Sequence, residues 1–293
     1  MQVSASRSCT DSRSVSLVDW LTPPACCNRV PVTTQEEMSA VVASAVAAQK
    51  KWRDVPVQQR TRVLIKFQTL LVANKEDIAM CMVAENGKTK VDAIGDITRG
   101  IEVVEHCLAM PSLMMGEAVE QISSNMDTKT IRQPLGVVAG IAPFNFPAMI
   151  PLWMLPIAVS TGNAFILKPS EKVPTASHKI VNLATEAGFP PGIISILHGG
   201  VNAVSFLCTH KDIKAVSFVG SGHVGRIVYD LCTKAGKRVQ CNMGAKNHAV
   251  ILPDAHQEQA LNGIIGAAFG AAGQRCMAIS VAVFVGGTSA ALA

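Results

Sequence analysis

The chain has 293 residues, of which 49% are hydrophobic and 16% are charged. This length and composition exclude a largely disordered chain and allow one large domain, or two ordinary ones, with a sizeable core. The net charge of +5 comes from scattered Lys and Arg residues, accompanied by one Tyr and three Trp. A nucleic-acid-binding surface needs clustered basic residues with stacking aromatics, so we expect no nucleic-acid partner.

The longest uncharged stretch, Gln133 to Leu167, is long enough to span a membrane but contains five prolines. Proline breaks helices, so this stretch favours buried strands, turns and helices over a membrane span. Nine cysteines without a C-x-x-C motif indicate free thiols in a reducing compartment. We therefore expect a soluble chain with no membrane partner and no metal site.

Residues 1–30 differ from the rest because they are rich in Ser and Arg but also contain Asp11 and Asp19. A mitochondrial transit peptide is rich in Arg and Ser and poor in acidic residues, so the match is weak. Two alternatives stay open. The segment is either a transit peptide to the mitochondrial matrix, or a disordered or mis-spliced leader on a chain that is otherwise cytoplasmic.

Helical periodicity dominates the next hundred residues. Thr33 or Thr34 is expected to cap the first helix, which extends to Trp52. Gly87 suits a left-handed C-cap at the end of the second. The second helix, the third helix and a following strand are predicted over 57–86, about 88–115 and 126–133. The chain is therefore expected to be mainly helical to about residue 133.

From Val137 the pattern changes to short apolar strands that alternate with helices. Such alternation predicts a parallel sheet covered on both faces, with right-handed crossovers. Nucleotides bind such sheets beyond the carboxyl ends of the strands. The strands of the predicted sheet are 137–141, 164–167, 193–197, 215–219, 238–241 and 248–252.

Two motifs carry groups suited to acyl chemistry. In Gly273-Gln274-Arg275-Cys276, a cation stands beside a thiol, and a neighbouring cation favours the nucleophilic thiolate. The alternative is a buried structural cysteine. In the P-F-N-F-P segment, two prolines flank Asn145, whose amide could donate to a developing oxyanion. The alternative is a rigid turn with a capping Asn.

Two further motifs suit a dinucleotide. Lys168 and Glu171 follow a strand, where they could reach ribose hydroxyls, and the carboxylate would favour NAD over NADP. The alternative is a surface ion pair. The segment Phe218 to Gly225 is a strand, a glycine turn and a helix start, which could hold a pyrophosphate, although it does not match the strict fingerprint.

The motifs F-N-F-P, K-P-S-E, F-V-G-S and G-Q-R-C occur in this order, and over roughly residues 30–285 the chain resembles the aldehyde dehydrogenase family. Segments 141–154, 242–248 and 270–278 are similar to its CoA-acylating branch. The resemblance implies that Cys276 is the nucleophile that forms a thiohemiacetal and then a thioester. Asn145, with the Cys276 amide, would form the oxyanion hole.

The resemblance also implies binding residues for cofactor and substrate. Arg99 and Arg275 would hold the substrate carboxylate. Lys172 stands where the family usually has Arg, which keeps the charge but loses the planar fork. The positions that would contact NAD are Ala142, Phe144, Lys168, Glu171, Lys172 and Ser221.

Asn242 stands where hydrolytic members of the family carry the Glu that activates water, 34 positions before Cys276. An amide cannot accept a proton at neutral pH, so CoA is the expected acceptor. The resemblance implies oxidation of methylmalonate or malonate semialdehyde to propionyl-CoA or acetyl-CoA, with loss of CO2. A hydrolytic aldehyde dehydrogenase is the alternative that Asn242 opposes.

The expected fold is α/β: N-terminal helices and a Rossmann-type parallel sheet, followed by an incomplete catalytic domain. The predicted domains are a leader over 1–30, an NAD-binding domain over 31–255 and the start of a truncated catalytic domain over 256–293. Strand 279–285 is expected to lack a partner. The other alternative to an active dehydrogenase is therefore a truncated, catalytically inactive fragment that binds NAD. The family implies a homo-oligomer, which is doubtful for this chain.

Overall fold

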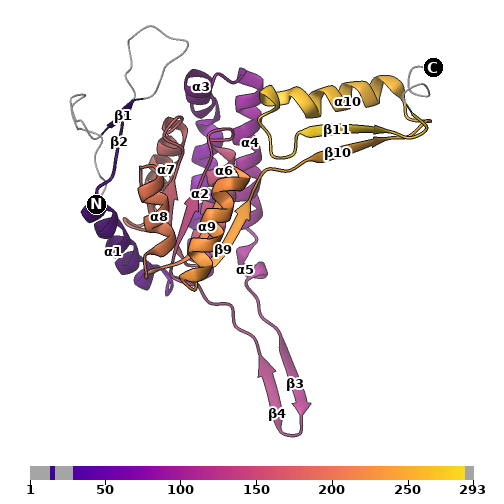
Figure 1. The fold of residues 1–293 in the computed structure, drawn as a ribbon. Coiled ribbons are helices and arrows are strands. Elements are labelled where there is room, and N and C mark those ends of the chain that lie inside the picture. Colours follow the sequence, from indigo (N-terminus) through magenta and orange to yellow (C-terminus); the bar gives the residue numbers. More distant parts are fainter. Residues whose placement is uncertain (1–13, 17–28, 288–293) are drawn as a thin grey trace.

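A computed structural model describes residues 14–16 and 29–287 of the chain. Most of the predicted leader therefore lies outside the described residues. The structure describes two short strands here, β1 (Ser14–Ser16) within the leader and β2 (Arg29–Pro31) at its end, and they pair in antiparallel orientation. The arrangement of the remaining elements is shown in Figure 1.

The N-terminal third is helical, as predicted. Thr34, one of the two candidates, caps the first helix in a capping box. Its hydroxyl accepts from the Glu37 amide at 3.3 Å, and the Glu37 carboxylate accepts from the Thr34 amide at 2.9 Å. The helices are α1 (Gln35–Trp52), α2 (Val57–Ala73), α3 (Lys75–Asn86), α4 (Lys90–Cys107) and α5 (Met110–Leu113).

Two predicted helices are shorter in the structure. The stretch 57–86 breaks at Asn74, whose side chain donates to the Leu70 carbonyl at 2.8 Å and so competes with helical backbone bonding. The stretch 88–115 divides after Cys107, and the new helix α5 has a proline in its first turn, where no amide is needed. Gly87 is confirmed as a C-cap, with φ of 78°.

A β-hairpin projects from the body of the molecule (Figure 1). Its strands are β3 (Ala118–Ser123) and β4 (Met126–Lys129), which pair in antiparallel orientation and are exposed along their length. The predicted strand over 126–133 is therefore shorter, and its partner β3 was missed. A positive φ at Gln121 and a shift in register interrupt the strand alternation in β3.

The central sheet has five parallel strands in the order β7-β6-β5-β8-β9. The chain fills one side of β5 with β6 and β7 and then crosses to the other side with β8 and β9. A crevice at the carboxyl ends of β5 and β8 is the expected result. The strands are β5 (Val137–Ile141), β6 (Ala164–Lys168), β7 (Ile194–Ile196), β8 (Ile213–Val219) and β9 (Arg238–Asn242).

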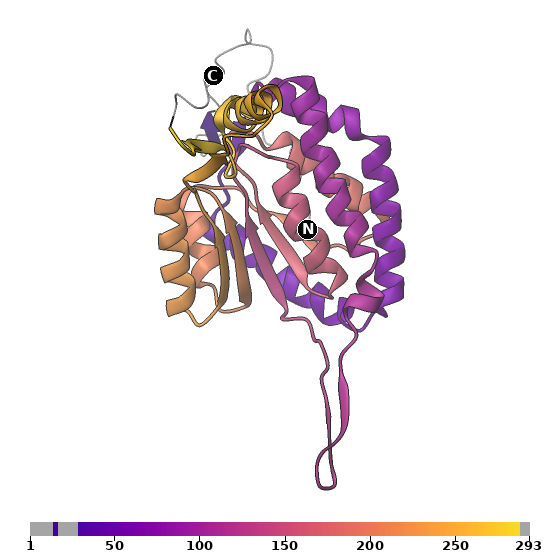
Figure 2. The ribbon, with the colours of Figure 1, turned by 90° about the vertical axis from the view of Figure 1, so that its right-hand side faces the viewer.

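Helices cover both faces of this sheet, as Figure 2 shows. α6 packs under α4 and α2 on one side, while α8 and α9 lie on the other. The core is continuous from the N-terminal helices through the sheet. The crossover helices are α6 (Met149–Ser160), α7 (Thr175–Ala187), α8 (Val201–Thr209) and α9 (Gly222–Lys234).

The last described elements form a separate arm (Figure 1): β10 (Asn247–Ile251), α10 (Gln257–Phe269), a 3-10 turn (Gly270–Gly273) and β11 (Ile279–Phe284). Two predictions are wrong here. β10 does not join the main sheet, and the strand near 279–285 does have a partner, because β10 and β11 pair in parallel. The link from β9 to β10 is too short for a parallel crossover, whereas α10 supplies one to β11. The domain limit between residues 255 and 256 stays a prediction.

Candidate active site

The residues predicted to bind a nucleotide lie at the carboxyl edge of the central sheet. Ala142 directly follows β5, and its amide donates to the carbonyl of Lys168, the last residue of β6, at 3.0 Å. Gly220 follows β8 and donates to the Asn242 carbonyl at the end of β9, at 3.1 Å. The strand order therefore gathers these segments at the point where the topology reverses.

Lys168 and Glu171 form an ion pair at 3.0 Å, and the Lys168 ammonium also donates to the Pro169 carbonyl. The Lys168 side chain is buried, whereas that of Glu171 is over one third exposed. Burial pushes the pKa of Glu171 up, but hydrogen bonds from its own backbone and from Lys168, with the charges of Lys168 and Lys172, hold it below its usual value. The carboxylate is thus ionised and open to a ligand.

The turn after β8 suits a phosphate group. Ser221 caps α9, and its hydroxyl accepts from the Val224 amide at 3.4 Å. At Gly220, an added Cβ would lie 2.5 Å from the Phe218 ring, so only glycine fits this turn. Helix N-terminal amides beside such a turn bind anions well. With Lys168 at the end of β6 and Glu171 just after it, two strands away at the same edge of the sheet, these residues fit a dinucleotide.

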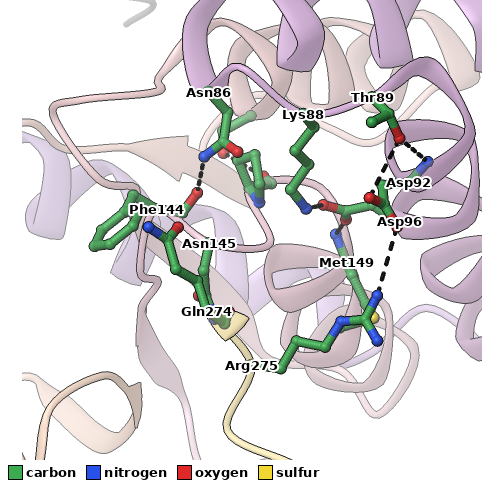
Figure 3. Close-up of polar contacts among 12 residues, drawn as sticks. Asn86, Lys88, Thr89, Asp92, Asp96, Phe144, Asn145, Met149, Gln274 and Arg275 are labelled. Atoms are coloured by element: carbon green, nitrogen blue, oxygen red, sulfur yellow. Dashed lines mark hydrogen bonds and ion pairs between the residues drawn. The ribbon is translucent and has the colours of Figure 1, made fainter. Parts of the chain in front are cut away.

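The loop that carries Asn145 is held by the α3–α4 junction, as Figure 3 shows. The Asn86 amide donates to the Phe144 carbonyl at 2.8 Å, and the Lys88 ammonium lies 4.2 Å from the centre of the Phe146 ring. Lys172 lies over the exposed Phe144 ring, 5.3 Å from its centre. Asn145 therefore stands between two residues that are fixed from outside the loop.

The loop before Cys276 bends sharply. Ala271 and Ala272 have positive φ values of 53° and 56°, a conformation that costs energy in residues other than glycine. The side-chain amide of Asn247 donates to the Cys276 carbonyl at 2.9 Å and to the Ala278 carbonyl at 3.0 Å. This half-buried thiol is therefore held at the start of β11 by a residue of β10.

Asn145 joins these two loops. Its side-chain amide donates to the Gln274 carbonyl at 2.7 Å (Figure 3), two residues before Cys276. Its Oδ1 is buried and has no hydrogen-bond partner among the described residues. An Asn amide has two donor hydrogens, so the second stays available for a reacting oxygen.

Both predicted substrate arginines lie at α4. Arg99 is an exposed residue of that helix. Arg275 pairs with Asp92 of the same helix, with 3.5 Å between Nη2 and Oδ1, and its Nη1 donates to the Gly266 carbonyl at 3.4 Å. An added Cβ at Gly270 would lie 2.5 Å from the Arg275 guanidinium, so a larger residue there would displace the end of this side chain.

Asn242 ends β9 and is exposed at one end of a cavity of about 460 Å³ along β8 and β9. Within the described part of the chain, no hydrogen bond links Asn242 to Cys276. Its distance in sequence from Cys276 therefore stays the basis for its predicted role.

Several residues at this site were missed by sequence reasoning: Asn86, Lys88, Asp92, Asp96 and Asn247. Asn247 lay within a segment that had been noticed for its resemblance, so a signal existed. The others are ordinary polar residues of a helical region, and their spacing carries no chemical signature.

Among the helices of residues 14–16 and 29–287, none is both long and apolar enough to cross a membrane. The same residues contain no group of three or more His, Cys, Asp or Glu side chains placed to hold a metal ion.

The chain belongs to the aldehyde dehydrogenase family, whose sequence profile matches residues 18–291. It is 55% identical over 258 residues to a probable methylmalonate-semialdehyde/malonate-semialdehyde dehydrogenase [acylating], mitochondrial, of Dictyostelium discoideum, covering 88% of this chain and 49% of the relative. The human methylmalonate-semialdehyde/malonate-semialdehyde dehydrogenase [acylating], mitochondrial, is 53% identical, with 88% of this chain and 48% of the relative covered.

Solved structures agree with this assignment. A putative methylmalonate-semialdehyde dehydrogenase from Sinorhizobium meliloti, complexed with NAD, superposes with a TM-score of 0.90 at 46% identity. The match covers 96% of this chain and 57% of that structure. A methylmalonate-semialdehyde dehydrogenase from Oceanimonas doudoroffii also gives 0.90 at 40% identity, covering 94% and 56%. The chain spans about half the length of the curated relatives it matches.

Proposed function

We propose that this chain carries the cofactor-binding and nucleophile-bearing machinery of an NAD-dependent, CoA-acylating dehydrogenase of methylmalonate and malonate semialdehyde. The observation that carries the proposal is the hydrogen bond from Asn145 to the Gln274 carbonyl. It brings an amide donor and a thiol-bearing loop together at the carboxyl edge of a nucleotide-binding type of sheet. The names of the most similar relatives support the choice of substrate.

The cofactor assignment rests on the carboxyl edge of the sheet. Lys168 and Glu171 would hold the adenosine ribose, and the ionised Glu171 would repel a 2′-phosphate. Ser221 and the first turn of α9 would hold the pyrophosphate. Ala142, Phe144 and Lys172 would complete the site.

In the proposed reaction, the Cys276 thiolate adds to the aldehyde carbonyl and forms a thiohemiacetal. The free N–H of Asn145 and the Cys276 amide stabilise the oxyanion. Bound NAD would supply the acceptor for the departing hydride. A thioester on Cys276 is then attacked by the CoA thiol, because Asn242 cannot act as a base for water. Cys276 leaves as thiolate, the distal carboxylate is lost as CO2, and the carbon that carried it takes up the proton that the CoA thiol releases. Propionyl-CoA or acetyl-CoA results.

Arg275 and Arg99 would select an aldehyde that carries a carboxylate. A charge-assisted hydrogen bond to a guanidinium contributes roughly 1.5–3 kcal/mol. Because iodoacetate and iodoacetamide differ chiefly in that charge, their relative rates with Cys276 test the clamp. We expect Arg275→Gln to slow the alkylation of Cys276 by iodoacetate about tenfold more than its alkylation by iodoacetamide. An equal effect on both reagents would contradict the assigned role.

A second candidate function, NAD binding without turnover, is favoured by the exposure of the arm. None of the described residues of α10 is buried, and Met277 beside the nucleophile is 75% exposed. Solvent at the site weakens the electrostatic contribution to the transition state. The third alternative is turnover by hydrolysis of the thioester. Asn242 argues against it, because an amide cannot act as the base for water.

Single-turnover kinetics on residues 1–293 separates these candidates. With methylmalonate semialdehyde and NAD alone, the proposed function predicts one equivalent of NADH that depends on Cys276, then a stall that CoA relieves. Steady turnover without CoA would indicate hydrolysis. NAD binding without NADH formation would support the second candidate, and absence of NAD binding would contradict both.

Cofactor choice is tested by titrating NAD and NADP side by side. We expect tighter binding of NAD, and Glu171→Gln should narrow the difference because it removes the charge that repels a 2′-phosphate. Equal or tighter binding of NADP to the unaltered chain would overturn the assignment.

The location and assembly of the protein are part of the same proposal. We place it in the mitochondrial matrix because the similar relatives are named mitochondrial, and fractionation of cells that express it tests this. The exposed hairpin β3–β4 suits assembly into a homo-oligomer, because an isolated two-stranded ribbon is only marginally stable. Light scattering tests that assembly.

A further inference from the structure

A buried ion pair lies behind the loop that carries Asn145. The Lys88 ammonium and the Asp96 carboxylate are 2.7 Å apart, and their side chains are 4% and 0% exposed. Burial raises the pKa of Asp96, and the charge and hydrogen bonds of Lys88 and the backbone amides of Met149 and Ala148 oppose this rise. Apolar residues often replace such pairs without loss of stability. The pair is therefore better explained by the geometry it imposes than by stability.

Both members of the pair touch the Asn145 loop, as Figure 3 shows for Asp96. Asp96 accepts from the Met149 amide at 2.7 Å, at the start of α6. Lys88 lies against the Phe146 ring. Asn86, two residues before Lys88, binds the Phe144 carbonyl. The residues on each side of Asn145 are thus held by the α3–α4 junction, and the end of its loop is held by the second turn of α4.

The same helix also holds the nucleophile loop. Asp92 lies one turn before Asp96 on α4, and it pairs with Arg275 beside Cys276. Its amide donates to Thr89, the N-cap of α4, at 3.1 Å. The first two turns of α4 therefore connect the two loops that Asn145 joins directly.

We propose that Asp96, together with Lys88, is a positioning residue that aims the Asn145 amide at the acyl group on Cys276. This inference rests on the proposed roles of Asn145 and Cys276. Asp96 touches no reacting atom. It acts through the backbone of the Asn145 loop, and a displacement of about 1 Å in such a group can slow a reaction about a hundredfold.

Two reactions of the Cys276 thiolate separate positioning from a general structural effect. With 4-nitrophenyl acetate, the thiolate attacks the ester carbonyl through an oxyanion, the C–O bond breaks, 4-nitrophenolate leaves and an acetyl group stays on sulfur. With iodoacetamide, the thiolate displaces iodide and no oxyanion forms. The ratio of the two rates therefore reports oxyanion stabilisation alone. Neither reaction needs NAD or CoA.

The test measures this ratio on the full chain, with the signal of Cys276→Ser subtracted and folding checked by circular dichroism. Asn145→Ala should lower the ratio about a hundredfold, and Asp96→Asn about tenfold. Asn86→Asp keeps the shape of the side chain but removes its hydrogen bond to the Phe144 carbonyl, so it should lower the ratio less than Asp96→Asn does. It is the second variant to measure if Asp96→Asn does not fold. Glu76→Gln breaks the exposed pair with Lys90 and is the matched control, with no change expected.

The outcomes are distinct. If Asn145→Ala lowers the ratio while Asp96→Asn and Asn86→Asp do not, the positioning role is overturned and the proposed function stands. Equal slowing of both reactions by Asp96→Asn would show a structural role only, and also overturns the inference. If Asn145→Ala leaves the ratio unchanged, the oxyanion role of Asn145 fails, and the role of Asp96 fails with it.

Discussion

The molecule contains two parallel strand-helix-strand units with the same local topology and different burial. In the first, β5-α6-β6, nine of the twelve residues of α6 are buried. In the second, β10-α10-β11, none of the thirteen described residues of α10 is buried. Both helices are rich in apolar residues. The difference arises because α6 lies between the sheet and the helices α4 and α2, whereas α10 packs mainly against the adjoining 3-10 turn and β11.

This comparison shows that apolar pattern and local pairing suffice to specify a strand-helix-strand unit, but a second layer decides how stable it is. Stability varies across a structure with buried apolar contact. We expect amides of β5 and β6 to exchange with solvent at the rate of global unfolding, and amides of the arm to exchange much faster.

Removal of a phenylalanine side chain from each unit should have very different effects on stability. Phe165 of β6 is 1% exposed and Phe269 of α10 is 73% exposed. Phe165→Ala should cost about 3–5 kcal/mol in the free energy of unfolding because it leaves a cavity. Phe269→Ala should change it by less than about 0.5 kcal/mol. Urea denaturation measures both, and similar losses would show that the arm belongs to the same cooperative core.

A fall in pH should destabilise the central sheet more than the arm, through His198, which lies two residues after β7. Its Nε2 lies 2.7 Å from that of His178, and among the described residues its buried Nδ1 has no partner. Burial, with the charges of His178 and Lys168, lowers the pKa of His198 to about 3. As pH falls below about 6.5, the unfolded chain takes up a proton that the folded chain refuses, so stability falls.

The expected loss through His198 is roughly 3 kcal/mol between pH 6.5 and pH 4. His198→Gln should flatten the dependence of unfolding free energy on pH over this range. The exposed His248 of the arm is the matched control, and His248→Gln should leave the slope as it is. A slope unchanged by His198→Gln would contradict the assigned titration.

Glycine-to-alanine changes in two helices should have opposite signs. At Gly100 of α4, an added Cβ would lie 2.6 Å from the Leu152 side chain, so Gly100→Ala should cost about 1–3 kcal/mol through overpacking. At Gly263 of α10, nothing lies within 4 Å. Gly263→Ala should stabilise its helix by about 0.5–1 kcal/mol, read from exchange of α10 amides. Destabilisation at Gly263 would indicate a partner that covers this face.

Much of the site could be predicted from the sequence because its parts follow strand ends. A parallel sheet brings all its carboxyl ends to one edge, so Asn145, Lys168 and Ser221, which stand at or just after the ends of β5, β6 and β8, lie at that edge, while their roles stay predictions. Cys276 was first noticed for the cation beside its thiol, and the resemblance added the roles of Cys276 as nucleophile and of Arg275 in substrate binding. The support from Lys88 and Asp96 could not be predicted, because it depends on how α4 packs against the start of α6, 53 residues further along the chain.

Local sequence patterns predicted most helices and strands of the body, the cap at Gly87, a first cap at Thr33 or Thr34, and the order of motifs that marks the family, because periodicity and capping act over a few residues. They did not predict the breaks at Asn74 and after Cys107. Two features depend on contacts between distant segments of the chain: β10 pairs with β11, and Asp96 lies behind the Asn145 loop. These contacts join segments whose local patterns fit several partners, and the lengths of the connections and the packing of the layers select one.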